Sequence, residues 1–196
     1  MNYWIISDTH FGHDKMMELF GRPVGFSVQL FNGLRACIKP EDILIHLGDV
    51  CFGADEGWHH QLSEKVPCFK RWLVLGNHDS KSNHWYLSHG WDFVAYTINL
   101  TLFGKALLFS HMPKIDSGYD INIHGHFHNN HHRDLEPELT AIKNDKQYLI
   151  AVENTGYKPV NLKTIIEERQ KTLHVTSGVT PPSQGLSSQT LPSLPE

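Results

Sequence analysis

Short apolar runs alternate with amphipathic segments through the first half of the chain. Three of these runs have the length and composition of buried strands, and they lie at residues 3–6, 43–47 and 72–75. Segments with helical spacing of apolar positions, or with helix start and stop signals, predict helices at residues 15–20, 27–39, 54–65 and 80–89. This half therefore reads as alternating strands and helices around a sheet.

The pattern changes after Gly90, where β-rich segments predominate. Strands are predicted at residues 93–102, 105–109, 121–123 and 148–152, with a terminal helix at 163–171. Phe103-Gly104 separates the first two as a hairpin turn would, and the polar stretch 129–146 is expected to be a long surface loop. The whole pattern predicts an α/β (α+β) fold in which two mixed sheets pack together with helices outside them.

Composition divides the chain into a folded part and a tail. From Thr176 onward the sequence consists mainly of Ser, Pro, Gly, Gln, Thr and Leu. Such a segment buries too little apolar surface to offset the entropy lost on ordering. We expect a single domain at 1–175 and a disordered tail at 176–196.

Charge and residue counts narrow the range of functions. The net charge of −4 and the pI near 6.4 argue against a broad nucleic-acid-binding surface. The three cysteines form no CxxC pair, and the chain shows neither a signal peptide nor a membrane-spanning run, which together predict a cytoplasmic protein. The 15 histidines, spread along the chain, are a reason to look for a metal or proton-transfer site.

Five predicted strands end in side chains that bind metals or carry protons. The blocks are Asp8-Thr9-His10, Gly48-Asp49, Gly76-Asn77-His78-Asp79, His111 and Gly125-His126-Phe127-His128. Ligands in α/β proteins gather at the carboxyl ends of strands, so these blocks are expected to meet in one site. Each block alone also fits a polar turn, but five in succession favour a shared function.

The order of these blocks resembles the signature of the calcineurin-like metallophosphoesterases. The resemblance covers residues 8–128 and implies a four-layer αββα sandwich with two metal ions at the carboxyl ends of the sheets. By this resemblance one ion is held by Asp8, His10, Asp49 and His128, and the other by Asp49, Asn77, His111 and His126. Asp49 would bridge the two ions.

The ligand types agree with this assignment. Carboxylate, imidazole and amide oxygen suit Mn²⁺, the ion we expect first, and also Fe²⁺, Zn²⁺, Ni²⁺ or Co²⁺. Two such ions, roughly 3.5–4 Å apart, activate a bridging hydroxide as the nucleophile and stabilise an in-line phosphoryl displacement. His78 is expected to protonate the leaving oxygen or to stabilise the charge of the transition state, and Asp79 is expected to orient its ring.

The sequence predicts the residues that contact the substrate less clearly than it predicts the metal ligands. Arg22 is a candidate for gripping a phosphate and His13 for meeting the substrate, although both also read as ordinary loop residues. The expected reaction is hydrolysis of a phosphodiester or phosphomonoester, with a lean toward a diester or a small nucleotide because the Gly76–Asp79 block resembles that of class III cyclic-nucleotide phosphodiesterases. A DNA or RNA nuclease and a non-catalytic metal-binding scaffold remain as alternatives. No nucleic-acid or membrane partner is expected.

Overall fold

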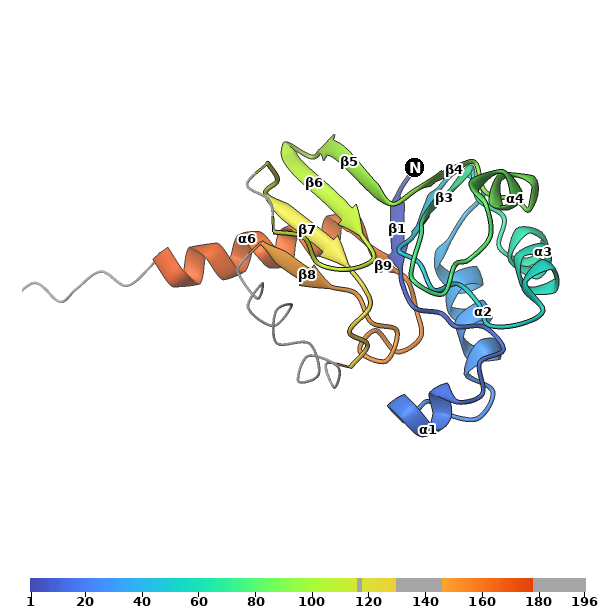
Figure 1. Cartoon of the computed structure of the whole chain (residues 1–196). Helices are drawn as coiled ribbons and strands as arrows, with labels where there is room; N and C mark the ends of the chain where they lie inside the picture. The colour runs from blue at the N-terminus through green and yellow to red at the C-terminus, as the bar shows by residue number, and fades with distance from the viewer. Residues whose placement is uncertain (116–117, 130–145, 178–196) are drawn as a thin grey trace, which may run out of the picture.

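Two β-sheets that share a hydrophobic core form the centre of the fold (Figure 1). The computed structural model of the chain describes residues 1–115, 118–129 and 146–177. Both sheets mix parallel and antiparallel pairs. The predicted α/β fold of two mixed sheets with helices is therefore confirmed.

The first sheet has five strands in the order β4-β3-β2-β1-β9. Their bounds are β1 (Tyr3–Ile6), β2 (Ile43–His46), β3 (Lys70–Val74), β4 (Phe93–Ala95) and β9 (Val160–Asn161). The first four run parallel to their neighbours, and β9 pairs antiparallel with β1. The chain therefore leaves β1, β2 and β3 at the same edge of this sheet, where the predicted ligand loops follow.

The second sheet has four strands in the order β5-β6-β7-β8. Their bounds are β5 (Thr97–Leu102), β6 (Lys105–Ser110), β7 (Ile121–His124) and β8 (Gln147–Leu149). The hairpin of β5 and β6 is as predicted, but the single strand expected at 93–102 is not. The chain leaves the first sheet after Ala95 and enters the second at Thr97, and the one connecting residue, Tyr96, is 76% exposed.

Four helices pack against the first sheet: α1 (Met16–Phe20), α2 (Phe26–Cys37), α3 (Asp55–Lys65) and α4 (Asn83–Ser88). Adjacent residues of β1 point to opposite faces, so Ile6 joins the helix-covered core while Ile5 joins the core between the sheets. Leu30 and Leu34 of α2 are fully buried in the helix-covered core. This alternation of buried faces explains why β1 and β2 read as continuous apolar runs.

The last helix, α6 (Leu162–Ser177), lies beside the second sheet (Figure 1). Its first turns add Leu162, Ile165 and Ile166 to the core between the sheets. The helix extends beyond the predicted residues 163–171 and includes Thr176 and Ser177, which the sequence places in the tail. The rest of the predicted tail, and most of the loop expected at 129–146, lie outside the described residues.

Within the part of the chain that is described, none of the helices is both long and apolar enough to cross a bilayer.

Candidate metal centre

The predicted ligands follow strands of both sheets, and their loops contact one another directly. The backbone N–H of Asp8 donates to the carbonyl of Gly48 over 2.9 Å, and the backbone N–H of His126 donates to Asp8 Oδ2 over 2.9 Å. The loop after β7 in the second sheet is thereby joined to the loop after β1 in the first. Sequence segments more than a hundred residues apart meet at one place.

Most of the predicted ligands have a left-handed backbone, which non-glycine residues seldom adopt. The residues with positive φ include Asp8 (54°), His10 (44°), Asp49 (56°), His126 (72°) and His128 (43°). Each such residue costs free energy, on the order of 1–3 kcal/mol, and persists only where the surrounding structure enforces it. Backbone strain is thus concentrated in the loops that carry the site.

Two glycines permit the close approach of these loops. A Cβ on Gly76 would lie 2.2 Å from Asp49 Oδ1, and a Cβ on Gly125 would lie 2.3 Å from Asp8 Oδ2. Both distances are far below ordinary contact, so a side chain at either position would displace a predicted ligand. Glycine is required here for space around the carboxylates rather than for turn formation.

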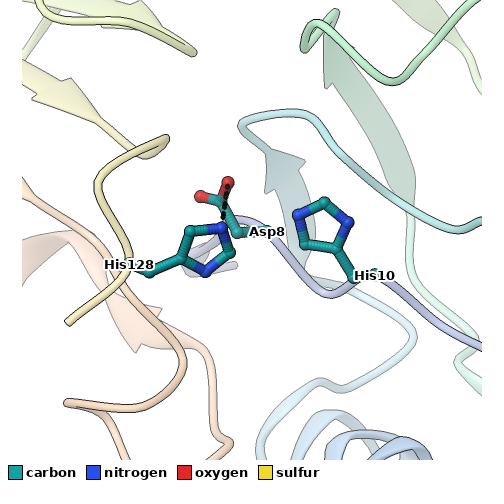
Figure 2. Close-up of side chains that lie close together, drawn as sticks. All are labelled: Asp8, His10 and His128. Carbon is teal, nitrogen blue, oxygen red and sulfur yellow. Dashed lines mark ion pairs between the residues drawn. The ribbon is translucent and has the colours of Figure 1, made fainter. Parts of the chain in front are cut away.

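One group of ligand atoms gathers around Asp8 (Figure 2). Asp8, His10 and His128 are all buried, and one donor atom from each lies within 4.8 Å of the others. Asp8 Oδ1 is 3.9 Å from His128 Nε2, and His10 Nε2 is 3.5 Å from Asp49 Oδ2. These are the four residues predicted to hold the first ion.

The second group converges on the side-chain oxygen of Asn77. Asn77 Oδ1 lies 2.9 Å from His111 Nε2 and 3.1 Å from His126 Nδ1, and the two ring nitrogens are 3.2 Å apart. Asp49 Oδ2 is 3.4 Å from His111 Nε2. The same Asp49 oxygen therefore lies beside a histidine of each group, which is the position that a bridging carboxylate needs.

The polar atoms of the first group fit a cation. Asp8 Oδ1 and both ring nitrogens of His10 are buried and have no hydrogen-bond partner among the described residues. Leaving such atoms unpaired in a protein interior is costly, and a divalent ion would satisfy Asp8 Oδ1 and one nitrogen of His10. The donor set of carboxylate, imidazole and amide oxygen matches divalent transition metals.

Crowding of charge in the centre changes the protonation of its carboxylates. Burial raises the pKa of Asp49 to about 6, against the lowering effect of His111 and with a further rise from the Asp8 charge. Burial also opposes ionisation of Asp8, but His111, His128 and His10 outweigh it and hold the pKa of Asp8 below its usual value. In the absence of metal, therefore, the two carboxylates differ in how readily they ionise.

The imidazoles of His111 and His128 each have one nitrogen turned away from the centre. His111 Nδ1 lies 2.8 Å from the carbonyl oxygen of Leu47, which can only accept, so Nδ1 carries the proton and Nε2 is left as an electron-pair donor. His128 Nδ1 lies 3.2 Å from Glu153 Oε1 in the same way. Contacts of this kind fix the tautomer of metal-binding histidines.

A family model described as calcineurin-like phosphoesterase matches residues 1–185. The chain belongs to the calcineurin-like phosphoesterases. This membership agrees with the two groups of ligand atoms, because the family is one of metal-dependent phosphoesterases.

Three proteins from different organisms are similar to this chain over most of its length. An uncharacterized protein of Methanocaldococcus jannaschii is 27% identical over 86% of this chain and 91% of its own length. The gene 66 protein of Mycobacterium phage L5 is 29% identical over 65% of this chain and 77% of its own length. The crystal structure of a protein of unknown function from Aquifex aeolicus is similar with a TM-score of 0.68 and 28% identity, covering 85% of this chain and 98% of that one.

His78 lies at the open side of the phosphoesterase centre, but Asp79 does not orient it. The Asp79 carboxylate accepts the backbone N–H groups of Gly76 (2.8 Å), Asp49 (2.8 Å) and Val50 (3.1 Å). The prediction that Asp79 positions the His78 ring is therefore wrong. Both oxygens of Asp79 serve instead to join the loop after β2 to the loop after β3, and thereby fix the backbone of Asp49.

The His78 imidazole faces the ligand cluster while remaining accessible. Its side chain is 41% exposed, and Nε2 lies 4.0 Å from Asp49 Oδ2. The backbone N–H of His78 donates to Asp49 Oδ1 over 2.8 Å, and its ring meets His10 edge-on with centroids 5.3 Å apart. Among the site residues, Asn77 and His78 are exposed and His126 is partly so, which marks this as the side open to a substrate.

Arg22 is not placed to grip a substrate. Its side chain is buried, ion-paired with Glu153 at 2.7 Å, and hydrogen-bonded to the carbonyl oxygens of Thr9 (2.8 Å) and Asp8 (2.7 Å). The prediction of a phosphate contact is wrong because these acceptors already occupy the guanidinium. Nothing in the sequence signalled Glu153, which is distant in the chain and belongs to no recognisable motif.

His13 lies beside the centre together with an unpredicted neighbour, Phe52. The His13 ring stacks on Phe52 with centroids 4.1 Å apart and lies 5.5 Å from the His10 ring. Phe52 is 52% exposed and meets His78 edge-on at 6.3 Å. The predicted substrate contact of His13 stays a prediction, and its position next to His78 is compatible with it.

Proposed function

We propose that this chain hydrolyses a small phosphate ester with the aid of two divalent ions, and that its preferred substrate is a phosphodiester or a small nucleotide. The observation that carries the proposal is the convergence of seven predicted ligand side chains, with Asp49 Oδ2 beside His10 on one side and His111 on the other. The buried Asp8 and His10 atoms without hydrogen-bond partners support occupation by cations. We propose Mn²⁺ as the native ion, on the mixed oxygen and nitrogen donors, and the reducing cytosol as the location, on the three unpaired cysteines.

The chain's own residues hold and shape the centre. Asp79 and the two glycines hold the loops at contact distance, so that the ligand atoms are in position before ions or substrate arrive. Two ions bound by these ligands would supply an ionised water as nucleophile and neutralise charge on the phosphoryl oxygens. Substrate would enter on the side where Asn77 and His78 are exposed.

We propose His78 as the group that protonates the leaving oxygen. Its ring lies over Asp49 and His10 with its outer edge in solvent, so it can reach an atom at the open side of the ions. A positioned acid of this kind contributes a factor of roughly 10²–10⁴ to the rate. No ligand role is required of it, so its removal is expected to leave both ions bound.

A preference for diesters follows from the charges available. The buried Arg22 is committed to Glu153 and two carbonyl groups, so it cannot help to neutralise the second charge of a phosphomonoester. A diester carries a single charge and needs less compensation. The Phe52 and His13 rings beside His78 offer a stacking surface for the aromatic ring of an aryl diester or for the base of a nucleotide.

The direct test is a screen of metal-reconstituted protein with matched phosphomonoesters and phosphodiesters. The protein is stripped of metal and loaded separately with Mn²⁺, Ni²⁺, Co²⁺ and Zn²⁺, and kcat/KM is measured for aryl and nucleotide pairs. We expect hydrolysis with the diester favoured. A wide preference for the monoester would contradict the diester assignment, and no turnover of any ester with two ions bound would contradict the enzyme assignment.

The role of His78 has its own test. His78→Ala is expected to lower kcat by roughly 10²–10⁴ with two ions still bound, and His60→Ala, at an exposed histidine on α3, is expected to have no effect. Metal content by elemental analysis accompanies the kinetics. Loss of both ions from the His78 variant would show that the residue is structural.

A further inference from the structure

Glu153 lies behind the metal ligand His128, on the side away from the centre. Its Oε1 atom is 3.2 Å from His128 Nδ1 and 2.7 Å from Arg22 Nη2. Arg22 Nη2 also lies 3.4 Å from His128 Nδ1, but its shorter contacts are with the Asp8 carbonyl and Glu153 Oε1, both at 2.7 Å. The carboxylate is an acceptor only, so it takes the His128 Nδ1 proton and leaves Nε2 directed toward Asp8.

Arg22 fixes this carboxylate to the other half of the first ligand group. The guanidinium donates from Nε and Nη2 to Glu153 Oε1, over 2.8 and 2.7 Å, and from Nη2 and Nη1 to the carbonyl oxygens of Asp8 and Thr9. It therefore joins the loop after β1, which carries Asp8 and His10, to the residue that orients His128. Of the three ligands in Figure 2, Asp8 and His128 contact this buried ion pair directly, and His10 follows Thr9, whose carbonyl oxygen accepts from Arg22.

His111 of the second ligand group has a weaker acceptor behind it. There the outward nitrogen of His111 meets the neutral carbonyl of Leu47 rather than a carboxylate. A carboxylate behind an imidazole makes that imidazole a stronger donor to a metal than a backbone carbonyl does. His128 and His111 are consequently supported by different chemistry.

We propose that Glu153, held by Arg22, is a positioning residue that selectively strengthens binding of the ion at Asp8, His10 and His128. The inference rests on the proposed dinuclear centre, and it assigns a role to a residue outside the ligand motifs. Glu153 acts through His128 and does not touch the ion or the substrate. Its removal weakens one ion position and spares the other.

The experiment isolates each position before testing Glu153. His111→Ala leaves the first position alone, and His10→Ala leaves the second alone. Glu153→Gln is added to each background, and Mn²⁺ affinity of the metal-stripped protein is measured by calorimetry and by electron paramagnetic resonance. We expect a loss of roughly 10–100-fold in the His111→Ala background and no change in the His10→Ala background.

A matched control is available on the protein surface. Glu64 lies 3.3 Å from His60 on α3, so it forms the same kind of carboxylate–histidine pair at an exposed site away from the ligands. Glu64→Gln is expected to leave both affinities unchanged. Glu153→Ala, which removes the acceptor as well as the charge, is expected to weaken the first position further than Glu153→Gln does.

Several results would overturn the inference. Equal weakening of both positions by Glu153→Gln would show a general structural role, as would a metal-free protein that no longer melts cooperatively. Unchanged affinity at the first position would show that the charge of Glu153 is irrelevant to the ion. Because the measurement is metal affinity, a failure to hydrolyse any ester would contradict the proposed function separately.

Discussion

Replacing Gly125 with alanine tests how closely the loops of the two sheets must approach. Gly125 has a backbone conformation open to alanine, so the substitution adds a methyl group without backbone strain. That Cβ would lie 2.3 Å from Asp8 Oδ2 and 1.9 Å from Ser7 Oγ, whereas real Cβ contacts are essentially never under 3.0 Å. The Ser7 hydroxyl can rotate, but the Asp8 oxygen accepts the backbone N–H of His126 and has to move with the loop.

The required movement sets the size of the effect. The Asp8 oxygen has to retreat by at least about 0.7 Å, from 2.3 to 3.0 Å, which displaces a metal ligand. Misplacement of about 1 Å costs on the order of 10²-fold in rate, or about 2.7 kcal/mol of transition-state stabilisation. We expect Gly125→Ala to lose about that factor in kcat/KM and to bind Mn²⁺ more weakly.

The assay compares Gly125→Ala with Gly57→Ala by calorimetric metal titration, by ester hydrolysis and by thermal melting of the metal-free protein. Gly57 lies in α3 with no atom within 4 Å of an added Cβ. Alanine there is expected to leave metal binding intact and to raise stability by about 0.5–1 kcal/mol. Full activity and full metal binding in Gly125→Ala would refute the close-approach explanation.

Three further outcomes follow from the structure. Phe52→Ala is expected to raise KM for an aryl diester but not for a small alkyl diester. The control Phe69→Ala, at another exposed phenylalanine, is expected to change neither KM, and equal effects of Phe52→Ala on both esters would exclude stacking. Burial lowers the pKa of His46 to about 3, against the raising effect of Asp8. The contribution of neutral His46 to stability is therefore complete above the unfolded pKa of about 6.5 and is lost as the pH falls toward 3, by at most about 1.4 kcal/mol per pH unit. In urea unfolding, His46→Gln is expected to flatten this pH dependence, and an unchanged slope would contradict the prediction. Mn²⁺ at 100 times its Kd is expected to stabilise the stripped protein by about 2.7 kcal/mol per site, and an unchanged melting temperature would exclude binding to the folded state.

The ligand set could be predicted from sequence because its signal is local. Each block follows an apolar strand, and parallel strands deliver their carboxyl ends to one edge of a sheet, so Asp8, Asp49 and Asn77 could be placed together without coordinates. The strands β1, β2 and β3 were predictable from their buried apolar runs. The resemblance to the family then divided the residues between two ions, and that division stays a prediction.

What could not be predicted depends on contacts distant in sequence. Arg22 reads as a loop cation, yet the buried acceptor that occupies it, Glu153, is 131 residues away. His59 reads as a surface residue of a polar helix, but it is buried and accepts a hydrogen bond from Trp91 over 2.8 Å. The break at Tyr96, where the chain passes from one sheet to the other, could not be predicted because the whole segment is β-rich.

The role of Asp79 shows the same limit at shorter range. Its position next to His78 favoured a side-chain pair, but a loop that returns to the sheet offers three backbone donors, and a buried carboxylate satisfies both oxygens with them. The position of Asp79 next to His78 in the sequence placed it correctly at the site, but its carboxylate contacts backbone N–H groups rather than the His78 ring.

The central claim, a dinuclear centre that hydrolyses phosphate esters, is tested most directly by titrating metal-stripped protein with Mn²⁺ while following both bound metal and hydrolysis of an aryl phosphodiester. The structure predicts that activity rises with metal and reaches its plateau at two ions per chain. A plateau at one ion, or two bound ions without hydrolysis, would contradict it.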